Sequence, residues 1–245
     1  MNMPPQRPLA ARTEPFDSYW QAPEDIEKGY DSFKQYYRSN FLRLLPSDRE
    51  ARILVVSCGP GYFVKLLNDE GFSNVRGIDS DSEKIVHAER RSLRCETAEA
   101  FPFLEARLAE FDMIVCEQEL NHLTKDEIIE FLALCRASLR AGGQLIVYGL
   151  NGANPITGAE AFAQNYDHFN TFTEYSLRQV LEYCRFEKIE VVPLKLYVFY
   201  KNPLNYVGMA ITGFLELSFR ILFKLYGKSN KIFTKKIAAT CRKPV

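Results

Sequence analysis

Residues 53–63 read ILVVSCGPGYF, and the rest of the chain can be placed around this stretch. A short apolar run over 53–56, rich in β-branched residues, is typical of a strand buried on both faces of a parallel sheet. It passes directly into the turn 57–61, and a segment with helical spacing begins at Tyr62. Strand, glycine turn and helix form the first half of a nucleotide-binding unit. Glycine lets the backbone approach a ligand closely, and a helix N-terminus offers unpaired N–H groups.

A second strand over 74–79 completes this unit and ends in Asp79. Asp79 lies 18 positions after Gly61, close to the spacing of about 20 at which a carboxylate binds ribose hydroxyls. The alternative role for Asp79 is a helix N-cap, because residues 80–83 read SDSE and open another helix.

The turn reads CGPG and so differs from the G-x-G-x-x-G pattern of nicotinamide enzymes. It resembles the first motif of class I S-adenosylmethionine-dependent methyltransferases, which commonly reads (D/E)-x-G-x-G-x-G. Ser57, Gly59 and Gly61 stand at the three glycine positions, and Val55 stands where the acid usually is. The resemblance implies S-adenosylmethionine as the cofactor and S-adenosylhomocysteine as its product.

Further segments match this family in the expected order. Residues 97–99 stand where the family holds the adenine, 111–116 match its Phe-Asp-hydrophobic strand, and 141–148 match its Gly-Gly-strand. The cofactor-binding residues that the resemblance implies are Ser57, Cys58, Gly59, Gly61, Asp79, Ser80, Thr97, Ala98, Glu99 and Glu117.

The fold class that follows is α/β, with a Rossmann-like, doubly wound sheet of seven strands. The resemblance implies the strand order 3-2-1-4-5-7-6 with strand seven antiparallel. We expect five segments: a flexible N-terminus (1–15), an N-terminal helical lid (16–50), the cofactor-binding core (51–194), a helical insertion (195–235) and the final core strand (236–245).

The predicted lid is rich in aromatic residues with helical spacing, and Pro46 ends it. These rings either pack on the core or cover the cofactor, in which case Tyr19, Tyr30 or Tyr37 would contact the substrate. A long segment over 151–169 has no clear periodicity, and a loop of this length is usually functional. Its first residue, Asn151, is therefore another candidate for substrate binding.

Methyl transfer requires a positioned acceptor and, for an alcohol, a base. His122 follows the predicted fourth strand and His168 lies in the loop after the fifth, both at the carboxyl edge where α/β sheets bind ligands. They are the candidate bases, with Glu119 as a third catalytic residue. A structural hydrogen bond is the alternative role for each histidine. A non-catalytic module of the same fold is the rival function, because Val55, Ser57 and Thr97 depart from the family pattern.

Charge is distributed unevenly, although 31 basic residues balance 31 acidic ones. From residue 195 onward there are ten basic residues and one acid, so the first 194 residues carry 21 basic and 30 acidic. An acidic body argues against a nucleic-acid partner. The six cysteines are scattered without metal-ligand spacing, so we expect no metal and a reducing, cytoplasmic compartment.

The insertion over 195–235 is apolar and basic. Its segment 204–226 carries charge only at Glu216, Arg220 and Lys224, and its first 12 residues are uncharged, short of the roughly 20 that a spanning helix needs. A core helix, a homodimer face and an interfacial helix in peripheral membrane contact remain open. For the acceptor we expect a small molecule or glycan, methylated on oxygen, with surface-polysaccharide biosynthesis as one setting and a quinone or other lipid as the alternative.

Overall fold

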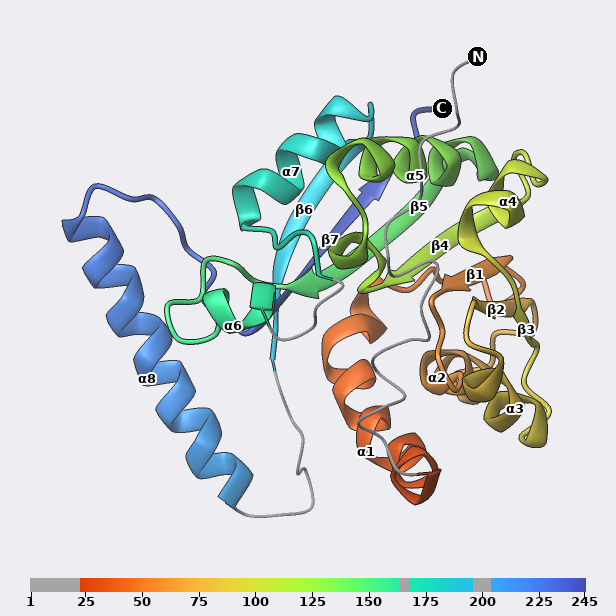
Figure 1. The fold of residues 1–245 in the computed structure, drawn as a ribbon, viewed down its shortest axis with the longest axis horizontal. Helices are drawn as coiled ribbons and strands as arrows, with labels where there is room; N and C mark the ends of the chain where they lie inside the picture. The colour runs from red at the N-terminus through yellow and green to blue at the C-terminus, as the bar shows by residue number, and fades with distance from the viewer. Residues whose placement is uncertain (1–22, 164–167, 196–203) are drawn as a thin grey trace.

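One seven-stranded sheet runs through the computed structural model, which describes residues 23–163, 168–195 and 204–245. The strands are β1 (Ile53–Val56), β2 (Val75–Asp79), β3 (Cys95–Thr97), β4 (Phe111–Glu117), β5 (Leu139–Leu150), β6 (Glu187–Leu194) and β7 (Lys236–Arg242). Their order is β3-β2-β1-β4-β5-β7-β6, and β7 runs antiparallel to both of its neighbours (Figure 1). The predicted order and orientation are confirmed.

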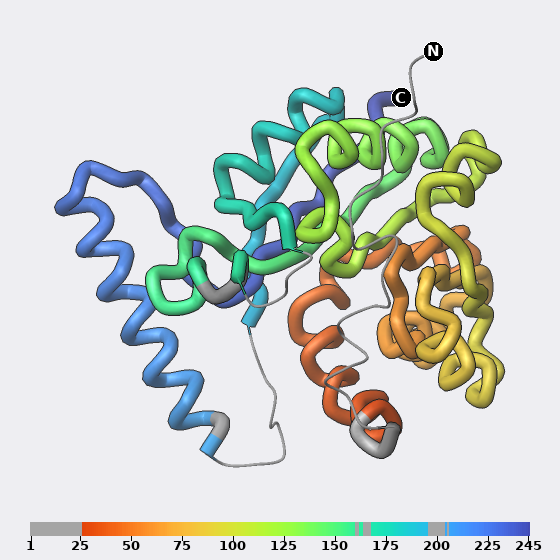
Figure 2. Tube along the Cα trace, viewed as in Figure 1, coloured from red at the N-terminus to blue at the C-terminus, as the bar shows by residue number. Residues whose placement is uncertain are grey.

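Helices cover both faces of this sheet (Figure 2). They are α1 (Pro23–Phe41), α2 (Tyr62–Asp69), α3 (Ser82–Arg90), α4 (Ala100–Glu105), α5 (Lys125–Ser138), α6 (Gly158–Ala163), α7 (Glu174–Tyr183) and α8 (Leu204–Leu225). Side chains of α1, α2 and α3 share one buried cluster with the sheet, and side chains of α4, α5 and α7 share the other.

Strand β1 shows why the apolar run of the sequence becomes the centre of the sheet. All four of its side chains are buried. Leu54 and Val56 pack in the cluster with α4, α5 and α7, while Ile53 and Val55 pack in the cluster with α1, α2 and α3. Because successive strand residues point to opposite faces, only a continuous apolar run suits a strand covered on both sides.

The predicted lid helix is α1, and its aromatic side chains pack on the core. Tyr37 and Phe41 lie with their ring centroids 4.8 and 5.3 Å from that of Phe63 in α2. Asn40 fastens the end of α1 to the end of β6, because its side chain exchanges two hydrogen bonds, of 2.9 and 2.8 Å, with the backbone of Lys195. Of the two roles predicted for these rings, packing on the core therefore applies to most of them. The N-terminal segment 1–15 and the first residues of the lid lie outside the described part of the chain.

One segment differs from the sequence-based expectation, and for a second the structure removes one of the alternatives that the sequence left open. The long loop after β5 contains the short helix α6, which its Gly- and Asn-rich sequence does not signal. Helix α8 stands away from the sheet layers and is broadly exposed to solvent, so the core-helix alternative does not hold (Figure 1). It is long and apolar enough to cross a membrane by length and composition.

Candidate active site

The turn after β1 is held in its shape by glycine conformations and by Asp79. Gly59 and Gly61 have positive φ angles of 52° and 84°, a region that costs other residues roughly 1–2 kcal/mol. The backbone N–H of Gly59 donates to Asp79 Oδ2 at 2.7 Å. The N–H of Asp81 donates to Asp79 Oδ1 at 2.9 Å. Asp79 therefore ties the end of β2 to the turn, and the N-cap of α3 is Asp81 instead.

Ser57 occupies the first glycine position of the motif and also has a positive φ, of 57°. Its hydroxyl donates a short hydrogen bond to the carboxylate of Glu119. This bond offsets part of the strain that a side chain has in the left-handed region. Burial raises the pKa of Glu119, while the Ser57 bond and the nearby charge of His122 lower it.

Glu117 ends β4 with its carboxyl group buried between two tyrosines. Its Oε2 accepts a hydrogen bond from the Tyr37 hydroxyl at 2.7 Å and a shorter one from the Tyr148 hydroxyl. Its Oε1 is buried and has no hydrogen-bond partner among the described residues. Burial raises the pKa of Glu117 to about 7, although both tyrosine bonds act to lower it. This side chain is therefore poised to change charge near neutral pH.

His122 and His168 are brought together from different loops. The side-chain nitrogen of Asn121 donates to the carbonyl of Asn170 at 2.8 Å, and the backbone N–H of Asn170 donates to the carbonyl of Asn121 at 3.2 Å. The N–H of Phe169 donates to the same carbonyl at 2.8 Å. These bonds join the two loops, so the imidazole centroids lie 4.8 Å apart with the ring planes at 72°.

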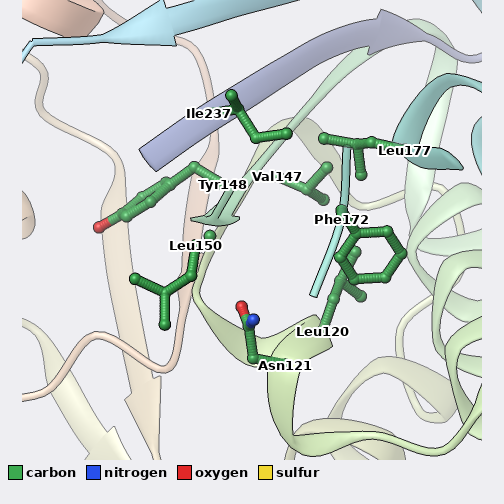
Figure 3. A pocket seen from close by; sticks show the side chains of 9 residues that line it. Leu120, Asn121, Val147, Tyr148, Leu150, Phe172, Leu177 and Ile237 are labelled. Atoms are coloured by element: carbon green, nitrogen blue, oxygen red, sulfur yellow. The ribbon is translucent and has the colours of Figure 1, made fainter. Parts of the chain in front are cut away.

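A small, mostly apolar cavity lies beside Asn121, the residue before His122. Figure 3 shows the Asn121 amide projecting into it from below, with Phe172 and Leu120 to one side and Leu150 to the other. Asn121 can approach β5 only because position 149 is glycine: a Cβ there would lie 2.4 Å from Asn121 Oδ1. No acidic or basic side chain among the described residues lines this cavity. The cavity is therefore not the reaction centre, and the residues that line it support the loops.

Three of the predicted substrate-binding residues are engaged with the protein itself. The Tyr30 hydroxyl donates to the carbonyl of Pro60, so this tyrosine supports the turn. The Tyr37 hydroxyl contacts Glu117, as described above. Asn151 is fully buried, and its amide donates to the carbonyl of Thr234 at 2.9 Å. Tyr19 lies outside the described residues.

The remaining predicted cofactor residues lie around the same edge of the sheet. Cys58 is buried beneath the turn, and Ser80 is exposed directly after Asp79. Thr97, the last residue of β3, and Glu99 are both exposed. Between them, the N–H of Ala98 donates to the carbonyl of Asp79 at 2.9 Å.

Sequence reasoning missed Tyr148 and the two joining asparagines. Tyr148 is the direct register partner of Glu117 between β5 and β4. The one hydroxyl in the apolar run 145–150, near the end of this strand, was the available signal. Asn121 and Asn170 are 49 positions apart, and nothing in their local sequence pairs them. Among the described residues, no group of three or more His, Cys, Asp or Glu side chains could hold a metal ion.

Comparison with known proteins agrees with this architecture. Residues 53–143 match the family model of a methyltransferase domain. No curated protein matches the chain. A solved S-adenosylmethionine-dependent methyltransferase from Archaeoglobus fulgidus is 16% identical, with a TM-score of 0.65, covering 91% of this chain and 100% of its own. One from Thermotoga maritima is 15% identical, with a TM-score of 0.63, covering 96% and 98%.

A third similar structure is a phosphoethanolamine N-methyltransferase from Haemonchus contortus in complex with S-adenosyl-L-methionine. It is 15% identical with a TM-score of 0.59, and the match covers 95% of this chain and 61% of that one. At these identities the similarity establishes the fold.

The described residues around the turn suit a cationic nucleoside cofactor. Among the described residues, a Cβ added to Gly59 would meet nothing closer than Lys84 Cδ at 4.0 Å, so these residues leave room above the turn. Asp79, Glu117 and Glu119 lie close enough for the charge of Asp79 to raise the pKa of both glutamates. Three carboxylates at one edge complement a positively charged ligand.

The two departures from the family motif do not disturb this site. Val55 is fully buried in the apolar cluster beneath α1 and α2, where an acid would need a partner. Ser57 keeps the left-handed conformation of the usual glycine.

Proposed function

We propose that this chain, a class I S-adenosylmethionine-dependent methyltransferase, methylates a hydroxyl group of a small-molecule or saccharide acceptor and uses His122 and His168 to take up the hydroxyl proton. One observation carries the proposal: two imidazoles from separate loops lie 4.8 Å apart at the carboxyl edge of the sheet. Glu119 lies close enough for its charge to interact with His122.

The chemistry explains why these groups suit the reaction. S-adenosylmethionine supplies a methyl group on a positively charged sulfur, and an in-line displacement needs little from the protein beyond orientation. A hydroxyl acceptor must lose its proton as the new bond forms, and neutral imidazole accepts protons well near neutral pH. Glu119 would stabilise the imidazolium of His122, while Ser57 holds the Glu119 carboxylate in place.

The residues around the turn would hold the cofactor. Asp79 has both carboxylate oxygens occupied by backbone N–H groups, and each oxygen keeps a lone pair for a ribose hydroxyl. Glu117, whose buried Oε1 has no hydrogen-bond partner in the described part of the chain, offers an acceptor for a cationic group of the ligand. Two tyrosines of α1 support this arrangement: the hydroxyl of Tyr30 donates to the turn, and the hydroxyl of Tyr37 donates to Glu117.

The acceptor class follows from the same surroundings. The acidic body of the chain is unfavourable for a nucleic-acid substrate. A glycan of surface-polysaccharide biosynthesis is one candidate acceptor, and a quinone or another lipid-like small molecule is the other. The six cysteines are all free, which supports a reducing, cytoplasmic setting.

Cofactor binding is tested first, by calorimetric titration with S-adenosylmethionine and S-adenosylhomocysteine. We expect micromolar binding that Asp79→Ala abolishes, because the substitution removes the ribose acceptor and releases the turn. Asp69→Ala is the matched control, since Asp69 pairs with Lys34 on the exposed side of α2. Equal binding by intact protein and Asp79→Ala would contradict this role of Asp79.

The histidine pair is tested by formation of S-adenosylhomocysteine with panels of saccharides, quinols and lipid-linked sugars as acceptors. We expect His122→Ala and His168→Ala to lower turnover by about 100-fold or more, the usual effect of losing a general base, while cofactor binding is kept. His87→Ala is the control, because this third histidine lies on α3 and contacts Glu27 of α1. Unchanged turnover in both variants would refute the assignment.

A further inference from the structure

Helix α8 arises at the same edge of the sheet as the candidate active site. Leu194, at the carboxyl end of β6, and Leu150, at the carboxyl end of β5, both pair with Lys236, the first residue of β7. The whole insertion between β6 and β7 therefore leaves and re-enters the sheet at its carboxyl edge. This is the edge that carries Asp79, Glu117 and the histidine loops.

Contacts near Phe233 hold the C-terminal half of α8 to the body. The Phe233 ring is buried, and its centroid lies 6.0 Å from that of Phe219 and 4.6 Å from that of Phe223. Side chains of the loop after β5 fix this anchor, because Asn151 and Asn154 donate to backbone carbonyls of residues 232–234. The orientation of α8 is therefore set by the same loop that follows β5.

The opposite side of α8 is apolar and exposed. Its large side chains are between about a third and three-quarters exposed: Tyr206, Val207, Met209, Ile211, Phe214, Leu217, Ile221, Leu222 and Leu225. A contiguous exposed apolar surface of this kind marks an interaction site. Figure 1 shows that the helix projects beyond α6, clear of both helical layers.

The charges around this apolar surface are mostly positive and favour an anionic partner. Arg220 and Lys224 lie on the flank of the helix, and Lys228 and Lys231 follow it in exposed positions. The chain from residue 195 onward carries ten basic residues and one acid, against an acidic body. A parallel symmetric contact between two copies of this surface would bring like charges together, whereas anionic lipid headgroups would neutralise them.

The connections of α8 exclude a membrane-spanning orientation. The 22 residues of α8 form a helix about 33 Å long. If it crossed the bilayer, the eight residues that join Lys195 to Leu204 would have to recross the hydrocarbon core. A recrossing helix needs about 20 residues, and other backbone exposed to lipid leaves its polar groups unsatisfied. If α8 contacts a bilayer, it therefore lies in the plane of the bilayer surface.

We infer that α8 is an interfacial helix that docks this methyltransferase on an anionic lipid bilayer, with the carboxyl edge of its sheet turned toward the membrane surface. Docking would present the active site to an acceptor held in the bilayer, and this last step rests on the proposed function. The binding itself does not depend on it. The lysines that follow the helix would contact headgroups while its apolar side enters the acyl boundary.

The test is co-sedimentation of the full chain with vesicles of phosphatidylcholine alone or mixed with an equal part of phosphatidylglycerol. We expect binding to the mixed vesicles that weakens as salt is added. The double variant Phe214→Asp/Ile221→Asp should bind at least about tenfold more weakly, because it places two charges in the acyl boundary. Leu108→Asp is the matched control, an exposed leucine remote from α8.

A charge-reversing pair separates headgroup attraction from apolar insertion. Lys228→Glu/Lys231→Glu should lose the preference for anionic vesicles, whereas Arg90→Glu, on exposed α3, should keep it. Absence of binding by the intact protein, or unchanged binding by both double variants, would overturn the inference. A dimer in light scattering that Phe214→Asp/Ile221→Asp converts to a monomer, without vesicle binding, would assign the surface to a second copy instead.

Calorimetric titration with S-adenosylmethionine keeps this result separate from the proposed function. All variants of α8 should bind the cofactor as the intact protein does, which also shows that they fold. Vesicle binding is measured without cofactor or acceptor, so its failure leaves the histidine assignment untouched. Loss of turnover in His122→Ala, in turn, should leave vesicle binding unchanged.

Discussion

The substitution Glu117→Gln should stabilise the protein relative to the unaltered chain, and this stabilisation should be larger at alkaline pH than at acidic pH. Glutamine has the shape of the glutamate, and its carbonyl oxygen can accept the hydrogen bonds that Tyr37 and Tyr148 donate to Oε2. The substitution therefore removes mainly the ability to ionise. What it reports is the free energy needed to charge a buried carboxyl group.

The magnitude follows from the pKa. Burial raises the pKa of Glu117 from 4.5 to about 7, and each pKa unit corresponds to roughly 1.4 kcal/mol. The folded chain thus holds this proton more tightly than the unfolded chain, so ionisation lowers stability by about 3 kcal/mol as pH rises from about 4.5 through about 7. Glu117→Gln is free of this loss. The difference in unfolding free energy between variant and unaltered chain should grow by about 3 kcal/mol over that interval.

Urea denaturation followed by circular dichroism, repeated from acidic to mildly alkaline pH, measures this difference. Glu130→Gln is the matched control, because Glu130 is exposed on α5. A difference between Glu117→Gln and the unaltered chain that stays constant across the pH series would refute the reasoning. It would mean that the carboxyl group ionises as freely in the folded chain as in water.

Three further substitutions test the packing around the site. Ser57→Gly should change the unfolding free energy in urea by no more than about 1 kcal/mol, because relief of the left-handed strain offsets the lost bond to Glu119. Asn40→Ala should lower it by about 2–3 kcal/mol, since the backbone of Lys195 loses both partners. Gly61→Ala should lower Tm and weaken cofactor binding in calorimetry. The new Cβ would lie 2.9 Å from a side-chain carbon, and alanine would have to keep a φ of 84°. An unchanged Tm would contradict this prediction.

Much of the fold could be predicted because its signals are local. The apolar run of β1, the turn after it and Asp79 at the end of β2 follow one another within 27 residues. Thr124 and Glu127 form the capping box that their spacing indicates at the start of α5. Helix α7, from Glu174 to Tyr183, likewise begins with a local capping box. Propensity, capping and burial agree in these segments, so sequence reasoning succeeds there.

The prediction of the strand order had a different basis. It rested on the resemblance to a family, because local sequence patterns do not show which strands are neighbours. The short helix α6 was missed because its few residues carry no periodic signal, and the asparagines before it fold through long-range bonds. Asn151, for example, is fixed by carbonyls more than 80 positions away.

The sequence by itself determined the nucleotide-binding unit, the candidate histidines, the acidic body and the basic, apolar insertion. Only the tertiary structure decided what these parts contact. It pairs Glu117 with Tyr148 by strand register and adds Tyr37 from α1, which creates the raised pKa. It also leaves the apolar side of α8 exposed, on an insertion that leaves and re-enters the sheet at its carboxyl edge. The physical reason is that desolvation and proximity arise when distant segments meet, whereas hydrophobic periodicity and turn chemistry are written along neighbouring residues.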